Sequence, residues 1–158
     1  MTVTIRLEGS EQLQRELRRL SGDLRQAVAD TVEAVAIELR ADIVESVERG
    51  PASGRTYMHY FYTTKNGKLA QGRKRAKPHT ASAPGQPPMS DTGYLANRIT
   101  FDRLGDLTAV VGTKVEYAVH LEYGTERMAA RPFFRPAVER MRPKYIGKLE
   151  DIIRRAAR

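Results

Sequence analysis

Apolar and polar residues alternate at the start of the chain. Val3, Ile5 and Leu7 occupy every second position of residues 2–8, with polar or charged residues between them. This period of two is typical of a strand that buries one face. We therefore predict a short strand over residues 2–8, ending at Gly9.

A second period begins at residue 13, where apolar residues recur every three or four positions. That spacing places them on one face of an amphipathic helix. The apolar stripe consists of Leu13, Leu17, Leu20, Leu24, Val28, Val32, Val35, Leu39, Ile43 and Val47. Ser10 can cap such a helix, Ser21 and Gly22 can break it in two, and Gly50 with Pro51 ends it. We predict a long N-terminal helix whose stripe lies in the core.

Residues 50–92 differ from the rest of the chain in composition. Residues 56–63 are rich in aromatic residues and threonine and have high strand propensity, and Asn66 with Gly67 favours a hairpin turn. Residues 81–88 contain three prolines, which exclude a helix or a central strand. We predict a loop or a short β-ribbon in this region.

The second half of the chain returns to regular patterns. Residues 94–104 and 107–112 predict two antiparallel strands joined by a turn. Residues 115–123 fit either a strand or a short buried helix. Helical spacing follows Pro136, which suits a first turn, whereas Pro143 is expected to kink or divide that helix.

These patterns predict an α+β fold. A small, mostly antiparallel sheet is packed by the long N-terminal helix and by the C-terminal helix. A length of 158 residues fits a single domain over residues 1–158. Residues 50–92 form a basic loop or hairpin insertion within it.

Positive charge is concentrated in that insertion. The chain carries 27 basic and 19 acidic residues, for a net charge of +8, and residues 50–92 hold seven of the basic residues and one acidic residue. The densest run is Arg73, Lys74, Arg75 and Lys77. We predict that this run contacts DNA phosphates or an acidic partner; a solvated face without a partner is the alternative.

Reactive residues are scarce. The chain has no cysteine, three histidines outside any metal-binding spacing, and no glycine-rich phosphate loop, so we predict no metal and no cofactor. His120 and Glu122 could form an acid–base pair on one face of a strand, but no nucleophile accompanies them. We predict that the protein is not an enzyme.

No stretch of the chain approaches 18 consecutive apolar residues, and its first residues lack the basic-then-apolar order of a signal peptide. We therefore predict a soluble protein without membrane contact.

Two linked motifs resemble a phage family. Residues 117–125 read Tyr-Ala-Val-His-Leu-Glu-Tyr-Gly-Thr, and residues 130–137 read Ala-Arg-Pro-Phe-Phe-Arg-Pro-Ala. Upstream, residues 81–88 read Ala-Ser-Ala-Pro-Gly-Gln-Pro-Pro, followed by Asp-Thr-Gly-Tyr-Leu at 91–95. Together these segments resemble the small neck proteins of tailed bacteriophages, which include the tail-component and tail-completion proteins of the minor tail protein Z type.

The resemblance implies a structural virion protein at the joint between capsid and tail. It implies a ring of identical subunits, six by the symmetry of the tail, with the adjoining neck or connector proteins and the tail tube or terminator as partners. Because a neck ring surrounds the passage of the genome, the basic run predicts non-specific contact with genomic DNA in the lumen, although this segment departs from the family pattern. Assembly is expected in the host cytoplasm. A tail terminator that caps the tube is the alternative, and a basic nucleic-acid-binding accessory protein is a third.

The motif residues also have physical roles that the sequence predicts. Gly124 allows a positive φ or a close backbone approach, and Thr125 can turn the chain. Glu122 needs a partner, for which we expect Arg131 or Arg135 of this chain or of the next subunit. Assembly contacts are predicted at Tyr117, Glu122, Tyr123, Gly124, Thr125, Pro132, Phe133, Phe134 and Pro136, with construction of the monomer core alone as the alternative.

Overall fold

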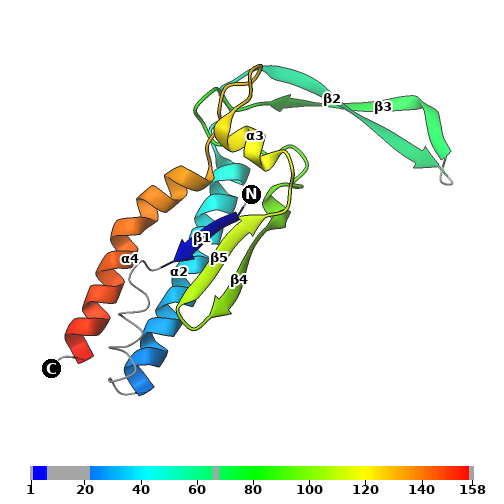
Figure 1. The fold of residues 1–158 in the computed structure, drawn as a ribbon. Coiled ribbons are helices and arrows are strands. Elements are labelled where there is room, and N and C mark those ends of the chain that lie inside the picture. Colours follow the sequence, from blue (N-terminus) through cyan, green and yellow to red (C-terminus); the bar gives the residue numbers. More distant parts are fainter. Residues whose placement is uncertain (1, 7–21, 66–67, 157–158) are drawn as a thin grey trace.

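The computed structural model describes residues 2–6, 22–65 and 68–156 of the chain (Figure 1). In chain order its elements are β1 (Thr2–Arg6), α2 (Gly22–Arg49), β2 (Thr56–Lys65), β3 (Lys68–Thr80), the 3-10 helix η1 (Ala96–Arg98), β4 (Ile99–Gly105), β5 (Thr108–Thr113), α3 (Ala118–Tyr123) and α4 (Phe134–Ala156). The predicted α+β class is confirmed.

The body of the molecule contains a three-stranded antiparallel sheet in the order β1-β5-β4. Val3 of β1 lies opposite Val111 of β5, and Phe101 of β4 lies opposite the same residue. The alternating pattern at the N-terminus therefore does form a strand, which ends at Arg6 within the described residues. The two strands predicted after residue 94 are also present, although residues 96–98 form the short helix η1 before β4 begins.

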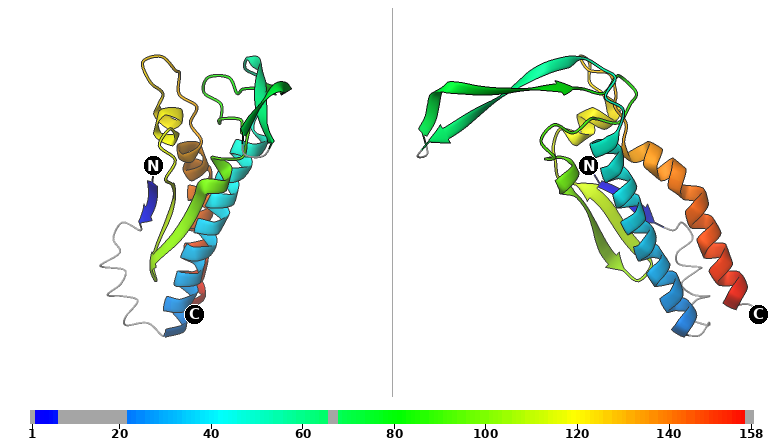
Figure 2. Two further views of the ribbon diagram at one scale, coloured as in Figure 1. Left: turned by 90° about the vertical axis from the view of Figure 1, so that its right-hand side faces the viewer. Right: turned by 180° about the vertical axis from the view of Figure 1, so that it is seen from behind.

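Helix α2 packs against both the sheet and α4 (Figures 1 and 2). Its predicted stripe is buried from Leu24 to Val47, whereas Leu13, Leu17 and Leu20 lie outside the described residues. The same core takes Ile99 and Val111 from the sheet and Phe133, Phe134 and Met141 from the C-terminal region. The stripe therefore has the role that its spacing predicts, which is to join the sheet to the second helix.

Helix α4 runs from Phe134 to Ala156 without division at Pro143, so the expectation that this proline divides the helix is wrong. Pro143 is exposed, and buried Met141 precedes it while half-buried Leu149 follows. Ion pairs from Arg140 to Asp42 and from Lys148 to Glu38 also hold α4 to α2 on both sides of the proline. This packing offsets the loss of one backbone hydrogen bond. Pro136 lies in the first turn, as predicted.

Strands β2 and β3 form a separate two-stranded antiparallel sheet, which we call the ribbon. It projects from one end of the body, as Figure 1 and the right-hand view of Figure 2 show. Its register runs from Thr56 opposite Thr80 to Lys65 opposite Lys68, with an irregularity between Tyr62 and Thr64. The predicted ribbon is confirmed and is longer than the sequence indicated, while the predicted turn residues Asn66 and Gly67 lie outside the described residues.

Within the described ranges, no helix combines the length and the apolar character that crossing a membrane requires.

Candidate assembly site at the base of the ribbon

The four motif segments, 81–88, 91–95, 117–125 and 130–137, meet where the ribbon leaves the body (Figure 1). The backbone N–H of Gly85 donates to the carbonyl of Ala130 at 2.8 Å, and the Arg131 guanidinium donates to the carbonyl of Ser82 at 3.3 Å. The N–H of Arg131 in turn donates to the carbonyl of Leu121 at 2.6 Å. Residues 81–88, 117–125 and 130–137 thus form one hydrogen-bonded unit, which we call the ribbon junction.

The ribbon junction also holds the base of the ribbon. Backbone bonds link Gly54 to Ala81 at 2.8 Å and Ala81 to Arg55 at 3.1 Å. A Cβ at Gly54 would lie only 2.5 Å from the carbonyl oxygen of Ser82, so only glycine permits this approach. At the same end of the body, the N–H of Ser90 donates to the Val47 carbonyl in the last turn of α2 at 2.9 Å. The direction of the ribbon is therefore fixed by backbone contacts to the body.

Glu122 is the buried charge at the centre of the ribbon junction. Its side chain lies on α3 with 5% of the residue exposed. One carboxylate oxygen accepts the backbone N–H groups of Phe133 at 2.8 Å and Phe134 at 3.0 Å, and the other accepts the N–H of Arg135 at 2.9 Å. The expectation of an arginine side chain of this chain as partner is wrong, because the Arg131 guanidinium faces Ser82 and that of Arg135 faces Glu139.

The start of α4 explains this choice of partner. The first N–H groups of a helix have no acceptor within the helix and carry the positive end of its dipole. Glu122 accepts three of them, and the next position is Pro136, which has no N–H to satisfy. One carboxylate thereby completes the hydrogen bonding of this helix end. Three charge-assisted bonds also compensate for burying the charge.

Gly124 ends α3 in a conformation reserved for glycine. Its φ is 78° and its ψ is −178°. A Cβ here would lie 2.8 Å from the Met128 carbonyl oxygen and 2.9 Å from the Ala130 nitrogen. Both predicted features, the positive φ and the close backbone approach, are confirmed.

Thr125 turns the chain, also as predicted. It exchanges two backbone hydrogen bonds with Met128, at 2.8 and 3.2 Å, and its hydroxyl accepts the N–H of Arg127 at 3.3 Å. This turn returns the chain from α3 to Ala130 and Arg131, which bond to the other motif segments. Gly124 and Thr125 therefore serve the ribbon junction.

Phe133 and Phe134 lie inside the body. They are 1% and 0% exposed, their ring centroids are 4.8 Å apart, and both belong to the main core. Of the two alternatives that the sequence left open for them, the structure places them in the monomer core and leaves no surface for a neighbouring subunit. Pro132 and Pro136 flank them and are half-buried.

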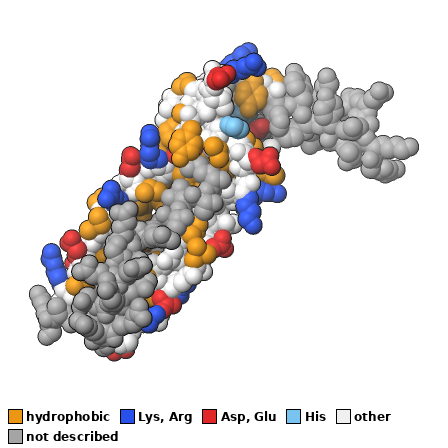
Figure 3. All heavy atoms as spheres, viewed as in Figure 1, with side chains coloured by type: hydrophobic (Ala, Val, Ile, Leu, Met, Phe, Trp, Pro, Cys, Tyr) orange, Lys and Arg blue, Asp and Glu red, His pale blue; other side chains and the backbone are white. Residues whose placement is uncertain are grey.

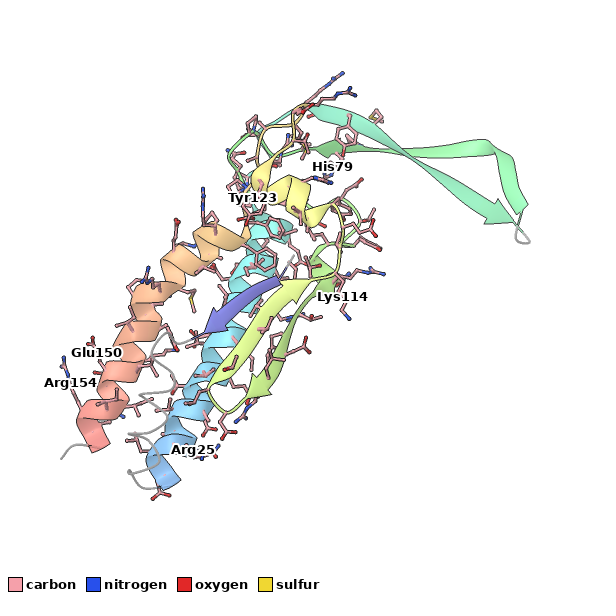
Figure 4. The ribbon with its side chains drawn as sticks, in the orientation of Figure 1. Arg25, His79, Lys114, Tyr123, Glu150 and Arg154 are labelled. Atoms are coloured by element: carbon pink, nitrogen blue, oxygen red, sulfur yellow. The ribbon has the colours of Figure 1, made fainter. Side chains whose placement is uncertain are left out.

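Tyr117 and Tyr123, at the two ends of α3, are the exposed aromatic residues of the predicted set. They are 44% and 70% exposed, and Tyr123 is labelled in Figure 4. Tyr117 lies 6.4 Å from Tyr94 between ring centroids, and Arg98 stacks on Tyr94 at 3.6 Å. Burial and the neighbouring Tyr94 raise the pKa of Tyr117, against the opposing effect of Arg98.

These exposed tyrosines occupy the end of the body where the ribbon starts. Figure 3 shows hydrophobic side chains on the surface at this end. Exposed aromatic side chains, with a large apolar face and a polar tip, are the type enriched in protein interfaces. The surface around α3 thus presents residue types that are enriched in protein interfaces.

The structure separates the other proposed pair. His120 is exposed, whereas Glu122 is buried, because residues two apart on a helix lie about 200° apart around its axis. The hypothetical acid–base pair, which required a strand, does not form. Among the described residues, no cluster of three histidine, aspartate or glutamate side chains could hold a metal ion.

The basic run lies on β3, opposite the aromatic strand. Arg75 pairs with Phe61, Lys74 with Tyr62 and Lys77 with His59 in the register of the ribbon. Arg73 belongs to the same strand. The sequence located both strands but not the register, which follows from the connection between Lys65 and Lys68 and from the irregularity at Tyr62.

Two buried hydroxyl groups, those of Ser82 and Tyr145, have no hydrogen-bond partner among the described residues. Ser82 lies in the ribbon junction, where its carbonyl, rather than its hydroxyl, accepts from Arg131. Burial raises the pKa of Tyr145 on α4 from 10.0 to about 12. No pattern in the sequence indicates that either hydroxyl is buried, because their burial depends on how α4 and the motif segments pack.

Replacing Tyr145 by phenylalanine should leave the free energy of unfolding at pH 8 unchanged or raise it by up to about 1 kcal/mol, because it removes an unpaired hydroxyl. In the wild type, the tyrosine of the unfolded chain ionises first, so stability falls as the pH rises from 10.0 towards about 12. Urea denaturation at pH 8 and pH 11 should therefore show a smaller loss for Tyr145→Phe. An identical loss in both proteins would contradict this assignment.

The described part of the chain is an α+β body from which a two-stranded ribbon projects (Figure 1). Residues 11–124 match the HK97-gp10-like family, described as "Bacteriophage HK97-gp10, putative tail-component". The chain belongs to this family and is a bacteriophage tail component. No curated protein and no solved structure matches it.

Proposed function

We propose that this tail component completes the tail and joins it to the capsid, as a ring of identical subunits. Six subunits would match the symmetry of the tail. The observation that carries the proposal is the ribbon junction, where the motif segments fix the ribbon and leave Tyr117 and Tyr123 exposed beside it. The partners would be the neck or connector proteins on one side and the tail tube or terminator on the other, within the virion.

The division of the motif residues supports this assignment. Glu122, Gly124, Phe133 and Phe134 hold the shape of the junction from inside, whereas the two tyrosines lie outside with about half or more of their surface free. Contacts between copies of one chain close a ring when each copy presents two different surfaces. The surface around α3, with its exposed tyrosines, and the ribbon are two such surfaces on one subunit.

Negative-stain imaging of particles made without this protein tests the role. If the protein completes the tail and joins it to the capsid, particles made without it should show mature capsids and mature tails that fail to join. Tails of irregular length would instead identify a tail terminator, and joined particles of normal appearance would contradict both roles. Expression of the wild-type protein should restore joined particles.

We expect the double variant Tyr117→Ser, Tyr123→Ser to weaken self-assembly or tail binding by a few kcal/mol, the scale of truncated aromatic anchors in interfaces. The matched control is Leu104→Ser, Ile146→Ser, because these residues are 68% and 45% exposed, close to the 70% and 44% of the tyrosines. Light scattering over a concentration series and co-sedimentation with tails measure the effect. Equal weakening in both variants would show that the tyrosines are not a specific contact.

A further inference from the structure

The ribbon has a charge distribution unlike the rest of the chain. Strands β2 and β3 together contain six basic residues and no acidic residue. Five of the six lie on β3, at Lys68, Arg73, Lys74, Arg75 and Lys77. The ribbon is therefore a projecting arm with cations in sequence along one strand.

In the body, by contrast, many charges lie in ion pairs. Among the described residues, ion pairs join α2 to α4, to β4 and to the turn before β5: Arg140 with Asp42, Lys148 with Glu38, Arg103 with Glu33 and Arg25 with Asp106. Outside residues 50–92, the chain has 20 basic and 18 acidic residues, close to balance. The positive charge that remains for an external partner is thus concentrated on the arm.

The register of the ribbon places like charges together. Lys65 lies directly opposite Lys68, an arrangement that destabilises an isolated antiparallel pair. An anionic partner relieves this repulsion. Arg75 opposite Phe61 and Lys77 opposite His59 add cations and rings at the same positions along the ribbon, and these are the residue types that contact phosphates and bases.

The dimensions of the ribbon select the kind of polyanion. The 10 residues of β2 span about 34 Å at the usual rise per residue, close to the length of one turn of B-DNA. The major groove of B-DNA admits a two-stranded antiparallel ribbon. The regularly spaced phosphates of DNA can meet several cations of one strand at once, whereas an acidic protein surface offers separate carboxylates.

We propose that the ribbon is a DNA-contacting arm, which lies along double-stranded DNA and neutralises its phosphates with Arg73, Lys74, Arg75 and Lys77. Contacts to phosphates position a protein without reading the sequence, so binding is independent of sequence. The proposal rests on the proposed function in one respect only, which is that the DNA is the genome passing the joint between capsid and tail.

Fluorescence anisotropy with two 30-base-pair duplexes of unrelated sequence tests this with the full-length protein. Wild type should bind both duplexes equally, and its affinity should fall steeply with salt. Replacing Arg73, Lys74, Arg75 and Lys77 by glutamine should weaken binding at least tenfold. It should also reduce the slope of log K against log salt by about 1 for each lost phosphate contact, up to about 4.

The matched control replaces Lys114, Arg142, Lys144 and Arg155 by glutamine. Like the arm variant, this control removes two arginines and two lysines, but from exposed positions of the body, so both variants lower the net charge by the same amount. DNA binding close to wild type in this control supports the arm. Equal losses in both variants would overturn the proposal, because net charge would then explain binding, and so would a wild type that binds neither duplex. Thermal unfolding of each variant checks that the core is intact.

Particles carrying the glutamine variant of the arm separate this proposal from the proposed function. Joined particles that lose their DNA support a DNA-contacting arm. Failure to join, with DNA binding in vitro equal to wild type, would show that the arm binds an acidic protein and would overturn the proposal. Particles that lack the whole protein test the joining role separately, so a failure of the proposed function can be told apart from a failure of this proposal.

Discussion

Glu122→Ala should lower the free energy of unfolding by roughly 3–5 kcal/mol, because it leaves buried N–H groups at the start of α4 without an acceptor. Phe133 and Phe134, whose N–H groups lose their partner, are almost completely buried, so water cannot replace the carboxylate there without opening the core. Urea denaturation, followed by circular dichroism, measures the change.

The matched control for this prediction is Glu139→Ala. Glu139 lies on α4 and is exposed, and its pair with Arg135 is long, at 3.8 Å. Exposed pairs of this kind contribute little, so the control should remain within about 0.5 kcal/mol of wild type. If Glu122→Ala were as stable as Glu139→Ala, the start of α4 would not depend on the buried carboxylate.

Gly124→Val should destabilise the protein by a similar amount, roughly 3–5 kcal/mol, from backbone strain together with overpacking. A branched side chain disfavours the φ of 78°, and its Cβ would meet backbone atoms of Met128 and Ala130 at 2.8 and 2.9 Å. These backbone atoms cannot move without breaking the turn at Thr125. We expect an insoluble or poorly folded protein, measured by soluble yield and thermal unfolding.

Gly147→Val is the control for the glycine position. Gly147 lies within α4, and a Cβ there would have no described atom within 4 Å. Its unfolding midpoint should stay near that of wild type, since valine is at least as compatible with a helix as glycine. Wild-type stability of Gly124→Val would mean that the turn after α3 tolerates another conformation.

The ribbon junction depends on both residues in different ways. Glu122 holds the start of α4, and Gly124 lets the chain turn back towards Ala130, which accepts the hydrogen bond from Gly85. Loss of either would loosen the contacts that fix the base of the ribbon. The two variants should therefore impair assembly as well as stability, whereas the tyrosine and arm variants should impair function in a folded protein.

Elements with local signals were predictable from the amino-acid pattern alone. The stripe from Leu24 to Val47 marks the buried face of α2, because the helix period sets which residues share a face. The alternation around Val3 marks β1, and the residues around Asn66 and Gly67 mark a hairpin. The positive φ of Gly124 was also predictable, because few other residues adopt it.

The way in which distant segments meet depends on long-range packing, which no local pattern indicates. The pattern of residues 115–123 fits a strand or a helix, and packing of Ala118 and Glu122 against the body selects the helix over residues 118–123. Glu122 could have paired with an arginine side chain. Instead its carboxylate accepts hydrogen bonds from three backbone N–H groups that converge at the start of α4. Packing of α4 on α2 also places Phe133 and Phe134 in the core. The same packing holds α4 together on both sides of Pro143, so it outweighs the helix-breaking preference of the proline.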